Sequence, residues 1–127
     1  MKVLSLFDGI SCGMLALQRA GIPVECYDAF EIDKYAVTVS KRNFPVIVHH
    51  GNVYDGDFTQ FQGYDLLLGG SPCTYWSIAK KDREVDCNGE GFRLFKEYVR
   101  ALEESGCKYF LYENNYSVHQ CLSLIHI

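Results

Sequence analysis

A cysteine beside a proline, Cys73, has the most direct chemical use of any residue here, because a thiolate is a strong nucleophile. It follows the apolar run 65–68 and the pair Gly69-Gly70, a pattern that predicts a buried strand running into a loop. In α/β sheets, reactive groups collect at the carboxyl ends of strands. A free cysteine is also a common buried hydrophobe, so this loop alone leaves both interpretations open.

Two glutamates also follow predicted strands. Glu31 ends the apolar run 24–30 and stands about 20 residues beyond the Gly9 turn, the spacing of a carboxylate that binds a nucleotide ribose. A solvated strand end is the alternative for Glu31. Glu113 ends the run 108–112, which we expect to lie beside the strand that carries the cysteine. The sequence therefore predicts a thiol and two carboxylates at one edge of a sheet.

Alternating strands and helices are predicted around these groups. The strands are residues 2–7, 24–30, 46–50, 65–68 and 108–112, and the helices are residues 14–20, 34–43 and 92–102. Asp33 is the expected N-cap of the second helix, and the polar segment 54–63 is predicted to be a connection. The apolar stripe of 92–102 is assigned to the core rather than to a cofactor site. The β-α-β-α-β order predicts half of a doubly wound, nucleotide-binding sheet.

The composition argues against several classes of protein. The net charge of -4 gives no overall electrostatic footprint for nucleic acid, and Lys80, Lys81 and Arg83 form either a basic cluster or a solvated loop. No apolar run approaches the ~18 residues of a membrane span. None of the six cysteines forms a C-x-x-C pair and the four histidines add no ligand spacing, which argues against a metal site. Without an export signal, we expect reduced thiols and a cytoplasmic protein.

Five motifs, in this order, resemble those of the N-terminal catalytic part of the DNA cytosine-5 methyltransferases over residues 2–120. They are Leu6-Phe7-Asp8-Gly9-Ile10, Glu31, Gly51-Asn52-Val53, Gly70-Ser71-Pro72-Cys73 and Glu113-Asn114. Pro-Cys alone is common and carries little weight, whereas five motifs in order at strand ends are specific. The resemblance implies a Rossmann-like, S-adenosylmethionine-dependent methyltransferase fold with a mostly parallel sheet, incomplete at its C-terminus, from a bacterium or a phage.

The resemblance also implies S-adenosylmethionine as the methyl donor. Phe7 would stack on the adenine, Gly9 would let the backbone approach the methionine part, and Glu31 would hold the ribose. Asn52 and Val53 would meet the edge and the face of the adenine. The full set of implied cofactor contacts is Phe7, Gly9, Ile10, Glu31, Asn52, Val53, Gly70 and Pro72.

Cys73 and Glu113 are the catalytic residues that the resemblance implies. Addition of the Cys73 thiolate to carbon-6 of cytosine would make carbon-5 nucleophilic enough to attack the methyl group. Glu113 would donate to ring N3 and contact the exocyclic amine as the thiolate adds. Tyr75 and Trp76 are expected to support the loop rather than to line the base pocket. Because both faces of the base are used, it must leave the duplex, and double-stranded DNA is the implied partner.

Several residues depart from the usual family pattern. Asn52 stands where the family has Asp, and Ser11 and Cys12 stand where it tends to have glycines. Thr74 replaces Gln and Asn115 replaces Val, a combination typical of a phage-like branch. These differences bear on substrate context more than on the type of reaction.

The family continues with an arginine-containing catalytic motif, a DNA-recognition domain and a segment that closes the cofactor pocket. We therefore expect residues 1–121 to be the N-terminal part of the catalytic domain and to be inactive alone. Residues 122–127 fit no family motif and resemble the translation of a transposase adapter used in sequencing libraries. They are expected to be a non-native tail, with a genuine apolar strand as the alternative.

Other functions remain open from the sequence. A tRNA cytosine-5 methyltransferase of the same architecture would share these motifs, and a non-catalytic S-adenosylmethionine-binding module would share the cofactor contacts. A Rossmann-type dehydrogenase would explain Glu31, but not the Pro-Cys and Glu-Asn sequences at the ends of the later strands.

Overall fold

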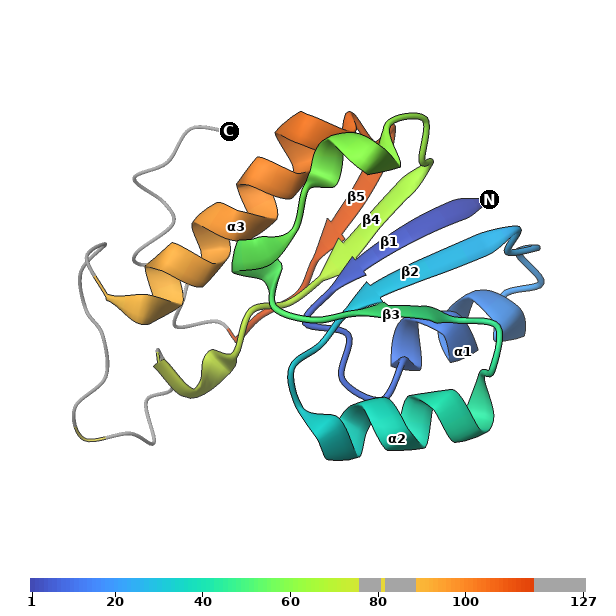
Figure 1. The fold of residues 1–127 in the computed structure, drawn as a ribbon, viewed down its shortest axis with the longest axis horizontal. Coiled ribbons are helices and arrows are strands. Elements are labelled where there is room, and N and C mark those ends of the chain that lie inside the picture. The colour runs from blue at the N-terminus through green and yellow to red at the C-terminus, as the bar shows by residue number, and fades with distance from the viewer. Residues whose placement is uncertain (76–80, 82–88, 116–127) are drawn as a thin grey trace.

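The computed structural model describes residues 1–75, 81 and 89–115, which form a parallel sheet with helices on both faces (Figure 1). The strands are β1 (Lys2–Leu6), β2 (Cys26–Phe30), β3 (Val48–His50), β4 (Leu66–Gly69) and β5 (Tyr109–Tyr112). Their order is β3-β2-β1-β4-β5, and all neighbours are parallel. This arrangement confirms the predicted Rossmann-like α/β fold.

The helices divide between the two faces of the sheet. Helices α1 (Cys12–Arg19) and α2 (Lys34–Asn43) link β1 to β2 and β2 to β3 on one face, and α3 (Glu90–Ser105) covers the other (Figure 1). Asp33 caps α2 as predicted, because its carboxylate accepts a hydrogen bond from the Tyr35 backbone N–H at 2.8 Å. No helix in the described ranges has the length and apolar character needed to cross a membrane.

Two helix ends carry left-handed residues with different chemistry. Gly106 follows α3 with a φ of 61°, and its N–H donates to the Leu102 carbonyl at 3.0 Å. Glycine adopts this conformation freely, so this end is unstrained. Ser11 precedes α1 with a φ of 66°, and its side chain makes no capping bond to that helix. A serine in this conformation needs support from elsewhere in the fold.

The strand register brings the predicted functional residues to one edge of the sheet. Leu6, the last residue of β1, lies opposite Phe30 on β2 and Gly69 on β4. Gly69 lies in turn opposite Tyr112, the last residue of β5. The residues that directly follow these strand ends therefore share one edge, and they are Phe7, Glu31, Gly70 and Glu113.

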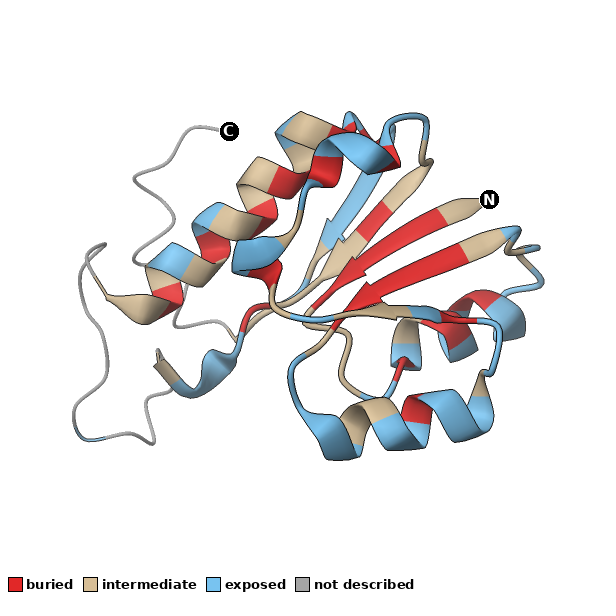
Figure 2. Ribbon diagram, viewed as in Figure 1, coloured by how far each residue is buried: buried red, intermediate tan, exposed pale blue. Residues whose placement is uncertain are grey.

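The central strand β1 is buried on both faces, since successive side chains of a strand point to opposite sides. Leu4 and Leu6 pack in the cluster beneath α3, and Val3 packs with Met14 of α1 on the other face. All three strand residues are 0% exposed, and Figure 2 shows the buried positions running along β1 and β2. This burial fixes the position of the turn that leaves β1.

The segment 54–63 has more structure than its polar composition predicted. It contains most of the 3₁₀ helix η1 (Val53–Asp55) and all of η2 (Phe58–Phe61), and both contact α3. Phe58 is 0% exposed and Phe61 is 6% exposed. The segment connects β3 to β4 as predicted, but two aromatic residues three positions apart anchor it against α3, which its polar composition did not indicate.

Strand β5 is at one end of the sheet among the described residues, and most of its side chains are exposed. Tyr109, Phe110 and Leu111 are 53%, 54% and 61% exposed, as the pale blue strand in Figure 2 shows. Tyr112 packs inward, with its ring centroid 4.9 Å from that of Tyr98 and 5.3 Å from that of Phe95, both on α3. The hydrogen bonds to β4 and these two aromatic contacts therefore hold β5 in place.

Candidate active site

Cys73 lies in the loop that follows β4 and begins the short 3₁₀ helix η3 (Cys73–Tyr75). Its thiol is free and the residue is exposed. Exposure at the carboxyl end of a strand is the position that the nucleophile interpretation requires. The alternative of a small buried hydrophobe at this turn is wrong.

Two glycines let the neighbouring strand ends come together beside this cysteine. A Cβ atom on Gly70 would lie 2.4 Å from the Glu113 carbonyl oxygen and 3.1 Å from Glu113 Oε2. A Cβ atom on Gly69 would lie 2.7 Å from the Leu6 carbonyl oxygen. Any side chain at these positions would push β4 away from β5 or β1, so the approach of Glu113 to the cysteine loop depends on glycine.

A polar clamp, formed by Tyr112, Asn114 and Asn115, holds the backbone of the cysteine loop. The Asn114 side-chain N–H donates to the Ser71 carbonyl at 2.7 Å, and the Ser71 and Tyr112 hydroxyls are 2.6 Å apart. The Asn115 side-chain N–H donates to the Cys73 carbonyl at 3.3 Å. The last residue of β5 and the two asparagines beyond Glu113 therefore set the position of the loop that presents the thiol.

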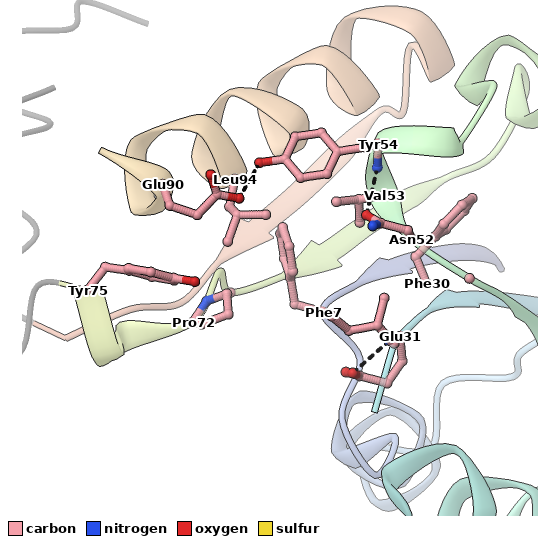
Figure 3. Close-up of a pocket in the computed structure, with 13 residues that line it drawn as sticks. Phe7, Phe30, Glu31, Asn52, Val53, Tyr54, Pro72, Tyr75, Glu90 and Leu94 are labelled. Atoms are coloured by element: carbon pink, nitrogen blue, oxygen red, sulfur yellow. Dashed lines mark hydrogen bonds between the residues drawn. The ribbon is translucent and has the colours of Figure 1, made fainter. Parts of the chain in front are cut away.

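A cavity of about 380 Å³ opens at the same edge of the sheet (Figure 3). Its lining includes residues from the turns after β1, β2, β3 and β4. Among them are six of the predicted cofactor residues: Phe7, Glu31, Asn52, Val53, Gly70 and Pro72. The register of the sheet thus gathers residues that are far apart in sequence around one hollow.

Glu31 is fixed in this cavity by backbone donors. Its Oε2 accepts a hydrogen bond from Gly9 N at 2.8 Å, and its Oε1 accepts from Ile32 N and Asp33 N, also at 2.8 Å. Gly9 has a φ of 58°, a conformation that glycine adopts without strain. The Gly9 turn and Glu31 are therefore one connected unit, and Glu31 is not a loosely solvated strand end.

Two of the predicted cofactor residues do not line this cavity. Gly9 contacts it through Glu31, as described above. Ile10 is 49% exposed and lines a separate hollow between α1 and α2 with Leu15 and Phe44. A cofactor contact at Ile10 therefore stays a prediction.

Asn52 and Val53 are held at the cavity by different means. The Asn52 side-chain oxygen accepts from Tyr54 N at 3.1 Å and caps η1, a role that Asp would also fill. Val53 is 5% exposed, and its carbonyl accepts from Arg100 Nη2 at 3.0 Å. The substitution of Asn for Asp at position 52 therefore keeps the local backbone support.

Arg100 on α3 is a structural residue of the site that the sequence analysis missed. Its guanidinium also donates to the Gly56 carbonyl at 2.9 Å and lies 4.5 Å from the centroid of the Phe58 ring. Burial lowers the pKa of Arg100, but the hydrogen bonds that its guanidinium donates to Glu97 and Glu104 outweigh this effect and raise the pKa overall. Arg100 thus ties the segment that carries Val53 to α3. Its position among the charged residues of α3 did not indicate this role from the sequence.

Tyr54 and Glu90 close the cavity on the side of α3 (Figure 3). The Tyr54 hydroxyl donates to Glu90 Oε1 at 2.7 Å. Burial, followed by this hydrogen bond, raises the pKa of Tyr54 to about 12. Leu94, one turn along α3, packs against the core cluster beneath that helix, as predicted for the apolar stripe, and also lines the cavity.

Several sequence predictions concern residues outside the described ranges. They include Trp76, Lys80 and Arg83 of the cysteine loop, and the segment 122–127. Within the described ranges, no group of His, Cys, Asp and Glu side chains could hold a metal ion.

Known proteins with similar sequences are phage and bacterial methyltransferases. The chain is 38% identical over 118 residues to the orphan methyltransferase M.SPRI of Bacillus phage SPR, covering 90% of this chain and 26% of that protein. It is 36% identical over 118 residues to M.Rho11sI of Bacillus phage rho11s, covering 90% and 23%. It is 34% identical over 116 residues to the type II methyltransferase M.HgiCII of Herpetosiphon aurantiacus, covering 89% and 25%. The chain therefore spans about a quarter of the length of these relatives.

Solved structures support the fold. The S. pombe Dnmt2 methyltransferase superposes with a TM-score of 0.73 at 18% identity, covering 98% of this chain and 36% of that one. Thermoplasma acidophilum 1320 superposes with a TM-score of 0.59 at 18% identity, covering 93% and 53%. Residues 1–121 match the family described as C-5 cytosine-specific DNA methylase. The chain belongs to the C-5 cytosine-specific DNA methylase family.

Proposed function

We propose that the protein carrying this chain transfers a methyl group from S-adenosylmethionine to carbon-5 of cytosine in DNA. One observation carries the proposal: the loop that lines the cavity also presents the exposed thiol. Gly70 and Pro72 line the cavity, and Cys73 follows directly. A methyl group delivered from the cavity would therefore arrive beside the nucleophile.

The residues around the cavity fit the proposed cofactor. The volume of about 380 Å³ lies within the ~300–1,000 Å³ typical of small-ligand pockets. Phe7 offers an aromatic face for the adenine, and Asn52 offers a carboxamide for its edge. Glu31 already accepts three backbone hydrogen bonds, two of them on Oε1. Its free acceptor capacity is therefore on Oε2, which we assign to a ribose hydroxyl.

The proposed reaction uses the two strand-end residues in sequence. The Cys73 thiolate adds to carbon-6 of the flipped cytosine while Glu113 donates a proton to N3, so the ring gains electron density at carbon-5. S-adenosylmethionine supplies the electrophilic methyl group that carbon-5 attacks. A base then removes the carbon-5 proton, the Cys73 sulfur leaves carbon-6, and N3 returns its proton. Both faces of the base are needed, which requires the base to leave the stack.

We also propose how this chain relates to the whole protein. Residues 1–121 are the N-terminal part of the catalytic domain, double-stranded DNA is bound with a recognition domain outside this chain, and the protein acts in the cytoplasm. The quarter-length match to the relatives supports this assignment. Residues 122–127 are a non-native tail, and codons unrelated to the adapter sequence would refute that origin.

The decisive experiment is trapping of the covalent intermediate. The full gene product is incubated with S-adenosylmethionine and duplex DNA containing 5-fluorocytosine, which has no carbon-5 proton to lose, and the adduct is mapped by mass spectrometry. We expect an adduct on Cys73 that is absent in Cys73→Ser. Cys26→Ser is the matched control, since Cys26 is a free cysteine at the start of β2, on the opposite edge of the sheet.

Two results would contradict the proposal. An undiminished adduct in Cys73→Ser would remove the nucleophile assignment. Methyl transfer to tRNA in preference to duplex DNA would keep the chemistry and overturn the substrate.

A further inference from the structure

Ser11 adopts a backbone conformation that serines rarely take. Its φ of 66° lies in the left-handed region, at the end of the turn that leaves β1. Phe7 and Gly9 in the same turn also have positive φ values, 57° and 58°. A non-glycine residue pays a steric cost in this region, so it persists only where the surroundings hold it.

Buried hydroxyls and a carboxylate surround the Ser11 side chain. Its Oγ bonds to Asp8 Oδ2 and to the Ser40 hydroxyl on α2. The Ser40 hydroxyl is in turn 3.2 Å from His49 Nε2 on β3. Ser11 and Ser40 are both 0% exposed, so water does not replace these partners. Asp8 Oδ1 is also held, by the Tyr27 hydroxyl at 2.7 Å.

The Asp8 carboxylate determines the donor and the acceptor in each hydrogen bond of this series. A carboxylate only accepts, so Ser11 gives its single hydroxyl proton to Asp8. Ser40 must then donate to Ser11, and His49 Nε2–H must donate to Ser40. His49 is therefore the tautomer with a bare Nδ1, and that atom is buried with no hydrogen-bond partner among the described residues.

The charge state of His49 agrees with this direction. Protonating Nδ1 would create a buried donor without an acceptor. Burial, followed by the nearby Lys41 charge, lowers the pKa of His49, which favours the neutral ring. The His49 donor on β3 and the Ser40 donor on α2 thus both point toward the turn, and this series of hydrogen bonds ends at the Asp8 carboxylate.

The same turn carries the cavity residues. Phe7 lines the cavity, and Gly9 N donates to Glu31 Oε2 at 2.8 Å. Ser11 N donates to the Asp8 carbonyl at 3.1 Å and closes the turn between them. A Ser11 that relaxed out of its left-handed conformation would therefore move Gly9 and Phe7 with it.

We propose that Ser40 and Asp8 are positioning residues, which hold Ser11 in the left-handed conformation that the cofactor turn requires. The hydrogen bonds from His49 through Ser40 and Ser11 to Asp8 hold Ser11 at a positive φ, which a glycine would adopt without such support. The proposal rests on the proposed function, because it assigns the turn to S-adenosylmethionine. It predicts that dependence on Ser40 disappears once position 11 is glycine.

The test is a double-mutant cycle between Ser40→Ala and Ser11→Gly in the full gene product. S-adenosylmethionine affinity is measured by calorimetry, and unfolding by urea is measured without the cofactor. In the parent background, Ser40→Ala leaves the Ser11 hydroxyl without its donor, and we expect a roughly fivefold or greater loss of affinity. In the Ser11→Gly background, we expect the same change to cost less than about twofold. The matched control is Ser105→Ala, another buried serine, which we expect to be additive with Ser11→Gly.

Each outcome decides the proposal. Coupling in both affinity and unfolding supports it. Coupling in unfolding alone shows a purely structural network and overturns the positioning role. Additivity in both measurements overturns the hydrogen-bond support of Ser11 as well. Absence of S-adenosylmethionine binding by the parent protein would instead refute the proposed function, while the unfolding cycle would still report on the support of Ser11.

Discussion

Replacing Gly70 by alanine is expected to damage catalysis more than stability. The added Cβ would lie 2.4 Å from the Glu113 carbonyl oxygen, and ordinary contacts of this kind begin at 3.4 Å. The end of β4 and the end of β5 must therefore separate by roughly 1 Å, a displacement that costs about 100-fold in rate when it misplaces reacting groups. Overpacking of this type costs about 1–3 kcal/mol of stability.

The assay compares turnover, cofactor affinity and urea unfolding in the full gene product. Under the proposed mechanism, we expect kcat for DNA methylation to fall about 100-fold in Gly70→Ala, because Glu113 and Cys73, the proposed catalytic pair, would no longer face one base. Gly51→Ala is the control for stability, since a Cβ there meets nothing within 4 Å. A kcat for Gly70→Ala within threefold of the parent value would refute the idea that close approach of the two strand ends sets the catalytic geometry.

Other perturbations test the supports of the site. Arg100→Met removes donors to the Val53 and Gly56 carbonyls, so we expect a loss of about 2–4 kcal/mol in the free energy of unfolding; a loss below 1 kcal/mol would contradict its role as a tie. Asp33→Ala removes the N-cap of α2 and should cost about 1 kcal/mol by the same measurement. The raised pKa of Tyr54, about 12 against an ordinary 10.0, stabilises the fold below pH 10, and that stability is lost as the pH rises through 12. The difference between the parent and Tyr54→Phe should shrink across this window, and a constant difference would contradict the Tyr54–Glu90 hydrogen bond.

The sequence predicted the sheet well because its strands carry strong local signals. The Leu66-Leu67-Leu68 run is continuous and ends in glycines, and the structure places β4 beside β1 as a parallel strand in which Leu67 is fully buried. Asp33 and Gly106 are helix-end residues whose chemistry acts within a few residues. The order of the motifs then predicted that the residues following each strand lie together, since the carboxyl ends of parallel strands lie at the same edge of the sheet.

The missed features depend on contacts between distant segments. Arg100 is one of several charged residues on α3, and only the packing of η1 and η2 against that helix gives it two backbone carbonyls to bind. Phe58 is buried because α3 covers it, although its neighbours are polar. The hydrogen bonds of Ser11 join the turn after β1 to α2 and β3. No local sequence pattern predicts such contacts, because neither partner is an unusual residue type within its own segment.

The exposed row on β5 has a consequence for handling the protein. Tyr109, Phe110 and Leu111 are each more than half exposed on a strand that ends the sheet order among the described residues. An open strand edge with apolar side chains is a template for pairing with another chain, and natural proteins usually shield it with charges or a covering element. Lys108 is the one charged residue that adjoins this row at its start. The 127-residue chain on its own is therefore expected to self-associate with concentration, and charged substitutions at Tyr109 and Leu111 are the direct route to a soluble sample.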